Sequence, residues 1–556
     1  MSSDNQTEPG RSGRGSPKRS GRRPQVIGPR LRVLLWVVFA LVALLAANSL
    51  YLLGVKWVGA ATGSNAENFF YLCMFAVHLA LGLLLVVPFV LFGLLHLRGA
   101  RHRKNRRAVK VGYALFAVSL LLLVSGILLV RFEGVLDLKD ATVRAILYWL
   151  HVACPLVALW LFWLHRLVGP RIRWRVGAYH LGAIGLLVAV FGFMHSLDPR
   201  AWRRVDQLSD KAFAAPSPAR TASGDPIPER SLVMDHYCKE CHADVHEGWY
   251  HSVHRFSSFN NPAYLASIRE TRRVLQERDG DPRASRWCAG CHDPVPLFTG
   301  AFDDPDFDMV NDPSSQAGIT CTVCHAITHV NSTIGNADYT IEEPIHYPFA
   351  YSENRLLKYI NKQLVKAKPA FHKKQFLKDF HSSAEFCASC HKVHLPKELN
   401  QFTEFLRGQN HYDSYLLSGV SGHGARSFYY PPKAEANCNG CHMPLQPSDD
   451  FGARPFDGAS EPSIHSHLFP SANTAIAWWR DQPDIVAAHQ QFLQGIVRVD
   501  LFGIKEGGEI DGELHAPLRP KLPRLQAGRS YLLEAVVRTT KLGHLLTQGT
   551  ADSNQL

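Results

Sequence analysis

Residues 33–55 read VLLWVVFALVALLAANSLYLLGV, an apolar run that no charged side chain interrupts. A helix needs about 20 such residues to cross the hydrocarbon layer of a bilayer. Four further apolar segments of comparable length follow, at about 68–96, 111–130, 145–165 and 176–195. We therefore predict an all-α, five-helix transmembrane domain over residues 33–196, with a basic tail at 1–32 before it.

The charged residues are distributed unevenly around these segments. Residues 1–175 carry 23 Lys and Arg against 6 Asp and Glu, whereas the rest of the chain carries 37 against 42. The basic surplus lies before the first segment and in the second-to-third and fourth-to-fifth connections. Because Lys and Arg are enriched in cytoplasmic loops, we predict a bacterial inner-membrane protein with a cytoplasmic N-terminus and a periplasmic chain after residue 196. The polar part is acidic, so we expect no nucleic-acid partner.

Histidines are the unusual feature of the apolar segments, because ionisable groups within a membrane are candidate functional residues. His151 and His165 lie 14 residues apart, which is about 21 Å along a helix. The predicted helix directions give an outer layer of His78, His151 and His195 and an inner layer of His96, His165 and His180. Two layers of imidazoles suit two stacked haems, each held by paired histidines, and interfacial or packing histidines are the alternative.

This arrangement resembles the dihaem cytochrome b subunits of the formate dehydrogenase gamma type, in which one helix supplies a ligand to each haem. His151 and His165 match that helix best. The sequence departs from the family because its first segment has no histidine, so the inner partner is either His96 or His180. The resemblance implies two b haems, with His78, His151, His165 and His180 as candidate iron ligands.

The cysteines after a Pro-, Ser- and Ala-rich linker at 197–230 follow one repeated pattern. They form CKECH (238–242), CAGCH (288–292), CTVCH (321–325), CASCH (387–391) and CNGCH (438–442). Two cysteines three positions apart can bond the vinyl groups of a haem, and the adjacent histidine can then bind the iron. Zinc knuckles and thioredoxin-like pairs do not require a histidine after every pair. We therefore predict a pentahaem c-type cytochrome domain, mostly of short helices and loops, at 231–480.

The motifs assign the haem-attaching residues directly. The cysteines are Cys238, Cys241, Cys288, Cys291, Cys321, Cys324, Cys387, Cys390, Cys438 and Cys441, and the proximal iron ligands are His242, His292, His325, His391 and His442. We expect histidine as the sixth ligand, because histidines are plentiful after residue 196 and only Met234, Met309 and Met443 lie there. Since methionine ligation raises the haem potential, this predicts low-potential haems.

The stretch at about 235–470 resembles the multihaem cytochrome c superfamily that includes hydroxylamine oxidoreductase and octahaem tetrathionate reductase. The resembling segments are CKECHADVHEGWYHSVH, GITCTVCHAITH, HSSAEFCASCHKVH, CNGCHMP and HSHLFPSANT. In such proteins a W-x-x-S-x-H tail after the first motif commonly supplies a ligand to another haem, and Trp249, Ser252 and His254 fill these positions here. The resemblance implies distal ligands among His254, His329, His381, His394 and either His465 or His467, each of which could instead be a surface or core residue.

Residues 490–556 follow a different pattern. GIVRVDLFGI and YLLEAVVRTT alternate and are rich in β-branched residues, which predicts strands. A GH-x-x-T-x-G cluster follows, at Gly543, His544, Thr547 and Gly549. The segment resembles the β-sandwich appended to some multihaem cytochromes, and we expect its strand pattern to continue beyond Leu556. The predicted fold is thus a membrane helical bundle, a multihaem domain and a C-terminal β-rich, sandwich-like segment.

Together these features predict electron transfer between quinone or quinol in the membrane and a periplasmic redox partner protein, in either direction, through b haems and five c haems. Such a chain would be a quinol:acceptor oxidoreductase. The alternative is a reductase or oxidase of a small nitrogen or sulfur compound at a c haem with an open iron position. No motif replaces its histidine by lysine, as pentahaem nitrite reductases do at their catalytic haem, so that enzyme is disfavoured. A haem-bearing scaffold whose β segment docks a partner is a third class.

Overall fold

The computed structural model describes residues 27–546 except 64, 132–137, 139, 169–171, 173, 199 and 201–213. Parts of the predictions lie outside the described residues: the tail at 1–26, the linker at 201–213, the cluster members Thr547 and Gly549, and the rest of the C-terminal segment to Leu556. The chain divides into two compact units. One comprises Met1–Trp202 with His346–Pro369, and the other comprises Arg203–Ile345 with Ala370–Leu556.

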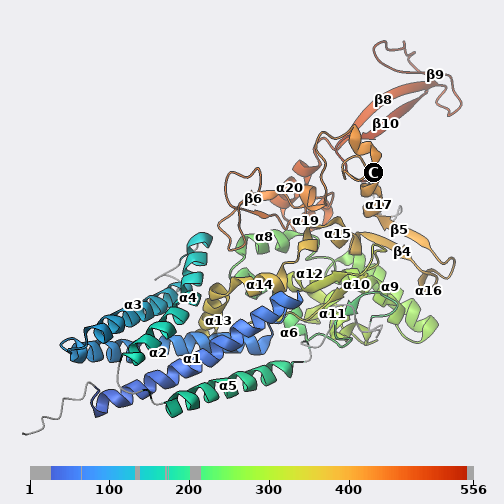
Figure 1. Cartoon of the computed structure of the whole chain (residues 1–556). Helices are drawn as coiled ribbons and strands as arrows, with labels where there is room; N and C mark the ends of the chain where they lie inside the picture. The colour runs from blue at the N-terminus through green and yellow to red at the C-terminus, as the bar shows by residue number, and fades with distance from the viewer. Residues whose placement is uncertain are drawn as a thin grey trace, which may run out of the picture. The chain divides into compact units, whose positions relative to one another are not determined.

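The first unit is built on five long helices, which correspond to the five predicted membrane segments (Figure 1). They are α1 (Pro29–Thr62), α2 (Phe69–Ala100), α3 (Arg106–Leu129), α4 (Ala141–Leu167) and α5 (Trp174–Ser196). Each is long and apolar enough to cross a membrane. Large apolar side chains such as Leu159 and Leu181 remain exposed on them, as expected for helices whose outer surface faces lipid. The prediction of five membrane-type helices is confirmed.

Polar residues define where these helices begin. The side chain of Asn68 accepts a hydrogen bond from the Tyr71 amide, and Asn105 and Asp140 cap α3 and α4 in the same way. Such N-caps satisfy backbone amides that have no partner within the helix. In the bundle, α1 packs against α2 and α5, and α3 packs against α2 and α4.

A segment from the second half of the chain belongs to this first unit. It comprises His346–Pro369 and contains α13 (Arg355–Ala367). Lys368 Nζ donates a hydrogen bond to Glu67 Oε1 at 2.7 Å and another to the Tyr71 hydroxyl at 3.0 Å. Both charged side chains are buried, with exposed fractions of 9% and 7%. This ion pair attaches the segment to the N-terminal end of α2, an arrangement that the sequence did not indicate.

The second unit consists of short helices joined by loops and small sheets (Figure 1). Its helices are α6 (Glu229–Leu232), α7 (Asp235–Lys239), α8 (Ala243–His251), α9 (Pro262–Asp279), α10 (Arg286–His292), α11 (Pro294–Thr299), α12 (Cys321–Ala326), α14 (Pro369–Phe376), α15 (Ala384–His391), α16 (Lys397–Asn400), α17 (His411–Leu416), α18 (Asn439–His442), α19 (Thr474–Trp479) and α20 (Pro483–Leu493). The prediction of a helical and loop region after the membrane helices is confirmed.

Three small sheets connect these helices. β1 (Arg220–Thr221), β3 (Tyr339–Ile341) and β2 (Ile327–Val330) form one sheet in that order, β4 (Lys392–Leu395) pairs with β5 (Leu406–Asn410), and β6 (Leu445–Pro447) pairs with β7 (Ser463–His465). The main apolar core of the unit lies beside the first sheet. It includes the fully buried side chains of Leu232, Phe259, Phe298, Phe302 and Ile341.

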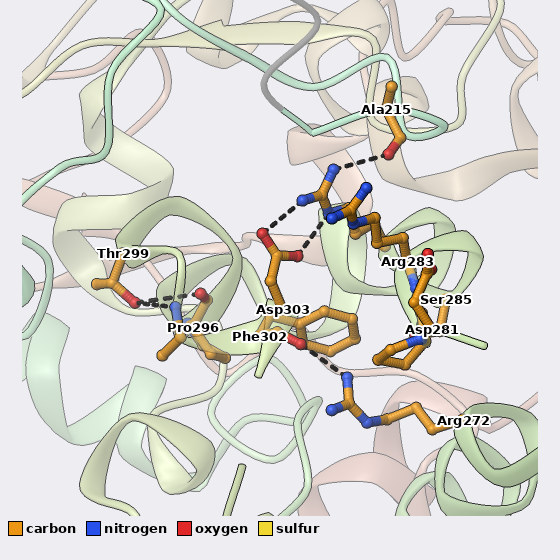
Figure 2. Close-up of polar contacts among 12 residues, drawn as sticks. Ala215, Arg272, Asp281, Arg283, Ser285, Pro296, Thr299, Phe302 and Asp303 are labelled. Atoms are coloured by element: carbon orange, nitrogen blue, oxygen red, sulfur yellow. Dashed lines mark hydrogen bonds and ion pairs between the residues drawn. The ribbon is translucent and has the colours of Figure 1, made fainter. Parts of the chain in front are cut away.

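Two arginines fix the chain around the second motif. Arg272, which is 4% exposed, donates hydrogen bonds to the backbone oxygens of Phe302 and Asp304, at 2.8 Å each. Arg286 forms a bidentate ion pair with Asp303, and the Arg272–Phe302 bond and the Asp303 carboxylate are seen in Figure 2. Bidentate guanidinium–carboxylate pairs define geometry as well as adding energy. The contacts of Arg272 and Arg286 hold α10, the helix that carries CAGCH, against the core.

The C-terminal segment forms one three-stranded antiparallel sheet in its described residues. β8 (Val497–Glu506) lies between β10 (Tyr531–Thr539) and β9 (Leu514–His515). β8 and β10 pair from Glu506 with Tyr531 to Val497 with Thr539, with a bulge between Glu534 and Ala535. The prediction of strands in this segment is confirmed.

Candidate functional site

Each CxxCH motif is folded into about one helical turn. The amide of His242 donates to the Cys238 carbonyl at 2.9 Å, and that of His442 donates to the Cys438 carbonyl at 3.0 Å. Residues three and four positions apart lie on the same side of such a turn. Thr320 additionally caps the helix that carries the third motif, by accepting from the Val323 amide. Both sulfurs and the imidazole of a motif are therefore presented to one side.

The motif cysteines are all free of disulfides. Thiols of different motifs are hydrogen-bonded to each other instead, in the pairs Cys238–Cys321, Cys291–Cys390 and Cys387–Cys438. The first motif is thus adjacent to the third, the second to the fourth, and the fourth to the fifth. Free sulfurs in neighbouring motifs fit a set of closely packed haems that are attached by thioether bonds.

The proximal histidines are oriented by hydrogen bonds from the ring nitrogen that would not bind iron. His292 Nδ1 donates to the Ser257 carbonyl at 2.8 Å, and His325 and His442 donate in the same way to the carbonyls of Phe376 and Pro470. His242 Nδ1 contacts the carboxylate of Asp450 at 2.7 Å. Metal-binding histidines almost always make such a bond, which fixes the tautomer and leaves Nε2 for the metal. The residues present therefore fit haem iron.

Several other histidines face the proximal ones at the spacing that a shared iron requires. Because a metal–imidazole bond is about 2 Å long, two imidazoles on opposite sides of one iron have ring centres about 6 Å apart. The ring centres of His254 and His391 lie 6.1 Å apart, and those of His467 and His325 lie 6.4 Å apart. His381 also faces His325, at 5.1 Å. The structure thus brings three predicted distal ligands to proximal histidines.

The other predicted distal ligands lie elsewhere. His329 Nδ1 contacts the Thr328 hydroxyl on β2. His394 on β4 stacks on Phe405 at 4.6 Å and contacts the Asn336 amide. His465 Nδ1 donates to a backbone carbonyl. Among the ring contacts of the described residues, none brings these three imidazoles to a proximal histidine.

Three histidines outside the predicted ligand set face motif histidines. His372 lies 6.2 Å from His242 with the ring planes 10° apart, His411 lies 5.7 Å from His391, and His544 lies 6.2 Å from His442. His544 belongs to the cluster noted in the sequence, which was a usable signal. The segment around His372, AFHKKQF, contains no comparable cue.

Burial keeps these imidazoles uncharged. It lowers the pKa of His325 and of His391 to about 3, and the pKa of His254 and of His372 to about 4, with nearby imidazoles as the next cause. Desolvation disfavours the charged form of histidine, and the neutral ring is the form that binds a metal. The site is therefore electrostatically prepared for coordination at neutral pH.

Two histidine pairs lie within the membrane helices. The rings of His78 on α2 and His151 on α4 are 6.3 Å apart, and so are those of His96 and His165 on the same two helices. In both pairs the ring planes are nearly perpendicular, at 82° and 80°. His180 instead stacks on Trp36 at 5.9 Å. Of the two alternatives for the inner partner, His96 is the one that faces His165.

Three of the four paired membrane histidines are oriented in the same way as those of the CxxCH motifs. His78 Nδ1 contacts Asn48 Oδ1 at 3.1 Å, and His151 Nδ1 and His165 Nδ1 contact the carbonyls of Leu122 and Ala108 at 3.1 and 3.2 Å. Nε2 is again left for a metal.

Glycines on α3 make room for these rings. A Cβ at Gly126 would lie 2.9 Å from His151, and one at Gly112 would lie 3.3 Å from His165. The positioning roles of Asn48, Gly112 and Gly126 were not visible in the sequence.

The paired imidazoles suit haem iron. Among the described residues, no group of three or more His, Cys, Asp or Glu side chains is arranged to hold a metal ion. Paired imidazoles fit an iron whose other ligands come from a porphyrin.

The motifs and their facing imidazoles define a c-type cytochrome region, which implies covalently bound haem c. The family model described as "Cytochrome c554 and c-prime" matches residues 237–326, the stretch that contains the first three motifs. No curated protein and no solved structure shows a significant match to the chain. The prediction of a c-type cytochrome region is confirmed, and haem-based electron transfer is the activity of this class of protein.

Proposed function

We propose that the chain is a membrane-anchored multihaem cytochrome of the bacterial inner membrane that transfers electrons between quinone or quinol and a periplasmic redox protein. When bound, haem supplies one-electron chemistry at its iron. The observation that carries the proposal is that imidazole pairs at iron spacing occur both on the membrane helices and beside the CxxCH motifs.

In this proposal the membrane unit holds two b haems, one between His78 and His151 and one between His96 and His165. The two ligands on α4 are 14 residues apart, which is about 21 Å along the helix. Two centres at that separation span most of a hydrocarbon layer about 30 Å thick. The unit can therefore carry electrons across the membrane and exchange them with quinone there.

The CxxCH unit is proposed to hold five c haems, in a packing related to that of the hydroxylamine oxidoreductase superfamily. The hydrogen-bonded cysteines of neighbouring motifs support this, because they bring motifs together that are up to 99 residues apart in sequence. The same unit would continue into a sandwich-like C-terminal domain. Four of its motif histidines, His242, His325, His391 and His442, have a second imidazole at iron spacing, which would favour electron transfer at those irons.

The decisive experiment adds a quinol analogue to the purified full-length protein and follows the α-bands of b and c haem separately. We expect the b band to be reduced first and the c bands afterwards. A pyridine haemochrome spectrum without a b component would contradict the membrane haems. A c band that stays oxidised while the b band is reduced would contradict the connection between them.

One observation favours a second candidate, a reductase or oxidase of a small nitrogen or sulfur compound. Within the described part of the chain, the ring that faces His292 is that of Tyr264, at 4.3 Å, and no second imidazole lies at iron spacing from His292. An iron with one protein ligand could bind a substrate. A high-spin ferric signal in electron paramagnetic resonance that shifts on adding nitrite or hydroxylamine would support this enzyme, and exclusively low-spin signals would support transfer alone.

A further inference from the structure

His544 follows the last strand of the C-terminal sheet and meets the fifth motif. Its ring centre lies 6.2 Å from that of His442, and the two ring planes are only 13° apart. The two residues are separated by about a hundred positions in sequence, and the whole of the C-terminal sheet lies between them. The fold therefore brings the end of the β segment back to the motif that precedes it.

Both rings use the same nitrogen, Nδ1, for a hydrogen bond to the backbone. His442 Nδ1 donates to the Pro470 carbonyl at 2.9 Å, and His544 Nδ1 donates to the Leu545 carbonyl at 3.0 Å. A bond to a backbone oxygen fixes each tautomer with the proton on Nδ1 and the lone pair on Nε2. Nε2 of each ring is therefore the nitrogen that could bind a metal ion.

The position of His544 is fixed by the chain just before it. Thr540 donates its amide to the Ile496 carbonyl at 2.8 Å, and its carbonyl accepts from the Tyr430 hydroxyl at 2.9 Å. The next anchor is Gly543, which lies against Val420 and Tyr415. These contacts tie the end of β10 to the region around the fifth motif and so fix the chain that carries the imidazole of His544.

His411 is the competing ligand, because its ring lies 5.1 Å from that of His544. However, His411 is hydrogen-bonded to the backbone of His391 and faces the fourth motif. The ring of His544 also lies at iron spacing from that of His442, at 6.2 Å. His544 is thus the imidazole that the geometry gives to the fifth motif.

We propose that His544 is the sixth ligand of the haem iron on CNGCH, opposite His442. This rests on the proposed haem at the fifth motif and goes beyond it, because it makes the C-terminal β segment part of a redox centre. The β segment then supplies a ligand to the haem of the fifth motif. Whether His544 is bound determines whether that iron has an open coordination position.

The test compares the full-length protein with His544→Ala and with the control His515→Ala. His515 lies on β9 of the same sheet, where its ring contacts Glu506. We expect His544→Ala to keep all five c haems but to convert one of them from low spin to high spin. Added imidazole should restore the low-spin signal, since it can occupy the vacated position. His515→Ala should leave the spin state unchanged.

A second variant keeps the proposal falsifiable if the alanine variant folds poorly. His544→Met should keep a low-spin iron and raise the midpoint potential of one c haem, because methionine ligation raises haem potential. Unchanged spin state and potentials in both His544 variants would overturn the proposal. Mass spectrometry of the peptide that contains Cys438 and Cys441 distinguishes failure of the proposed fifth haem from failure of the proposed ligand. A peptide without haem would refute the fifth haem, whereas a peptide with haem and an unchanged spin state would refute His544 as its ligand.

Discussion

The membrane helices and the CxxCH unit both bring imidazoles together in pairs, but they hold the cofactor differently. In the membrane unit four histidines on α2 and α4 are the proposed iron ligands of the b haems, and no CxxCH motif adds a covalent bond there. In the CxxCH unit two cysteines hold each haem covalently, so the axial histidines tune the iron instead of retaining it. Loss of one imidazole should therefore have different consequences in the two units.

The largest effect is expected in the membrane pairs. His151→Ala or His165→Ala should remove one b haem, because that haem has no covalent bond to the chain and loses one of its two iron ligands. The pyridine haemochrome ratio should fall from two b haems to one per five c haems. His180→Ala is the matched control, since its ring stacks on Trp36 and should leave both b haems in place. Two b haems in all three variants would refute the membrane ligand assignment.

A substitution that touches no ligand should have a similar effect at the outer pair. Gly126→Leu places a side chain where a Cβ would already lie 2.9 Å from the His151 ring, so the ring must turn away from His78. We expect loss or strong destabilisation of the outer b haem only, measured by redox titration of the b band. Gly177→Leu on α5 is the control, because the space around Gly177 is open. Equal spectra for both variants would show that the close approach has no role.

The ion pair that attaches His346–Pro369 to the membrane helices allows an intermediate prediction. Lys368→Met leaves the Glu67 carboxylate buried without its cation, which typically costs about 3–5 kcal/mol. We expect faster protease cleavage within residues 346–369 and weaker hydrogen-exchange protection of α13. The double variant Lys368→Met with Glu67→Leu should recover most of the protection, because an apolar pair needs no counter-charge. Equal cleavage of wild type and single variant would contradict an anchoring role.

The sequence predicts well the features that are local in the chain. Residues 33–55 are apolar throughout, so length alone predicts the helix that became α1. A CxxCH motif is recognisable because its two sulfurs and its imidazole lie within five consecutive residues. The strands β8 and β10 were predicted because an alternating pattern is also local.

Distal ligands could not be predicted in the same way, because each depends on a contact between distant segments. His372 reaches His242 from 130 residues further along the chain, and nothing in its neighbours marks it. The choice between His96 and His180 depends on how α2 and α5 are rotated about their own axes. Trp36, which stacks on His180, lies on a third helix. Helix rotation and long-range packing are properties of the folded bundle, not of any short stretch.

The smallest predicted effect comes from Asp450, which contacts the Nδ1 of the proximal His242 at 2.7 Å. A carboxylate bonded to a ligating imidazole makes it a stronger electron donor and so favours ferric iron. Asp450→Asn should raise the potential of one c haem by no more than about 60 mV, which is a tenfold change in a one-electron equilibrium. The exposed neighbour Asp449→Asn should leave it unchanged. The thioether bonds should retain the haem in both variants. Loss of the haem, instead of a shifted potential, would contradict the view that the CxxCH unit retains its haems covalently whereas the membrane unit depends on imidazoles.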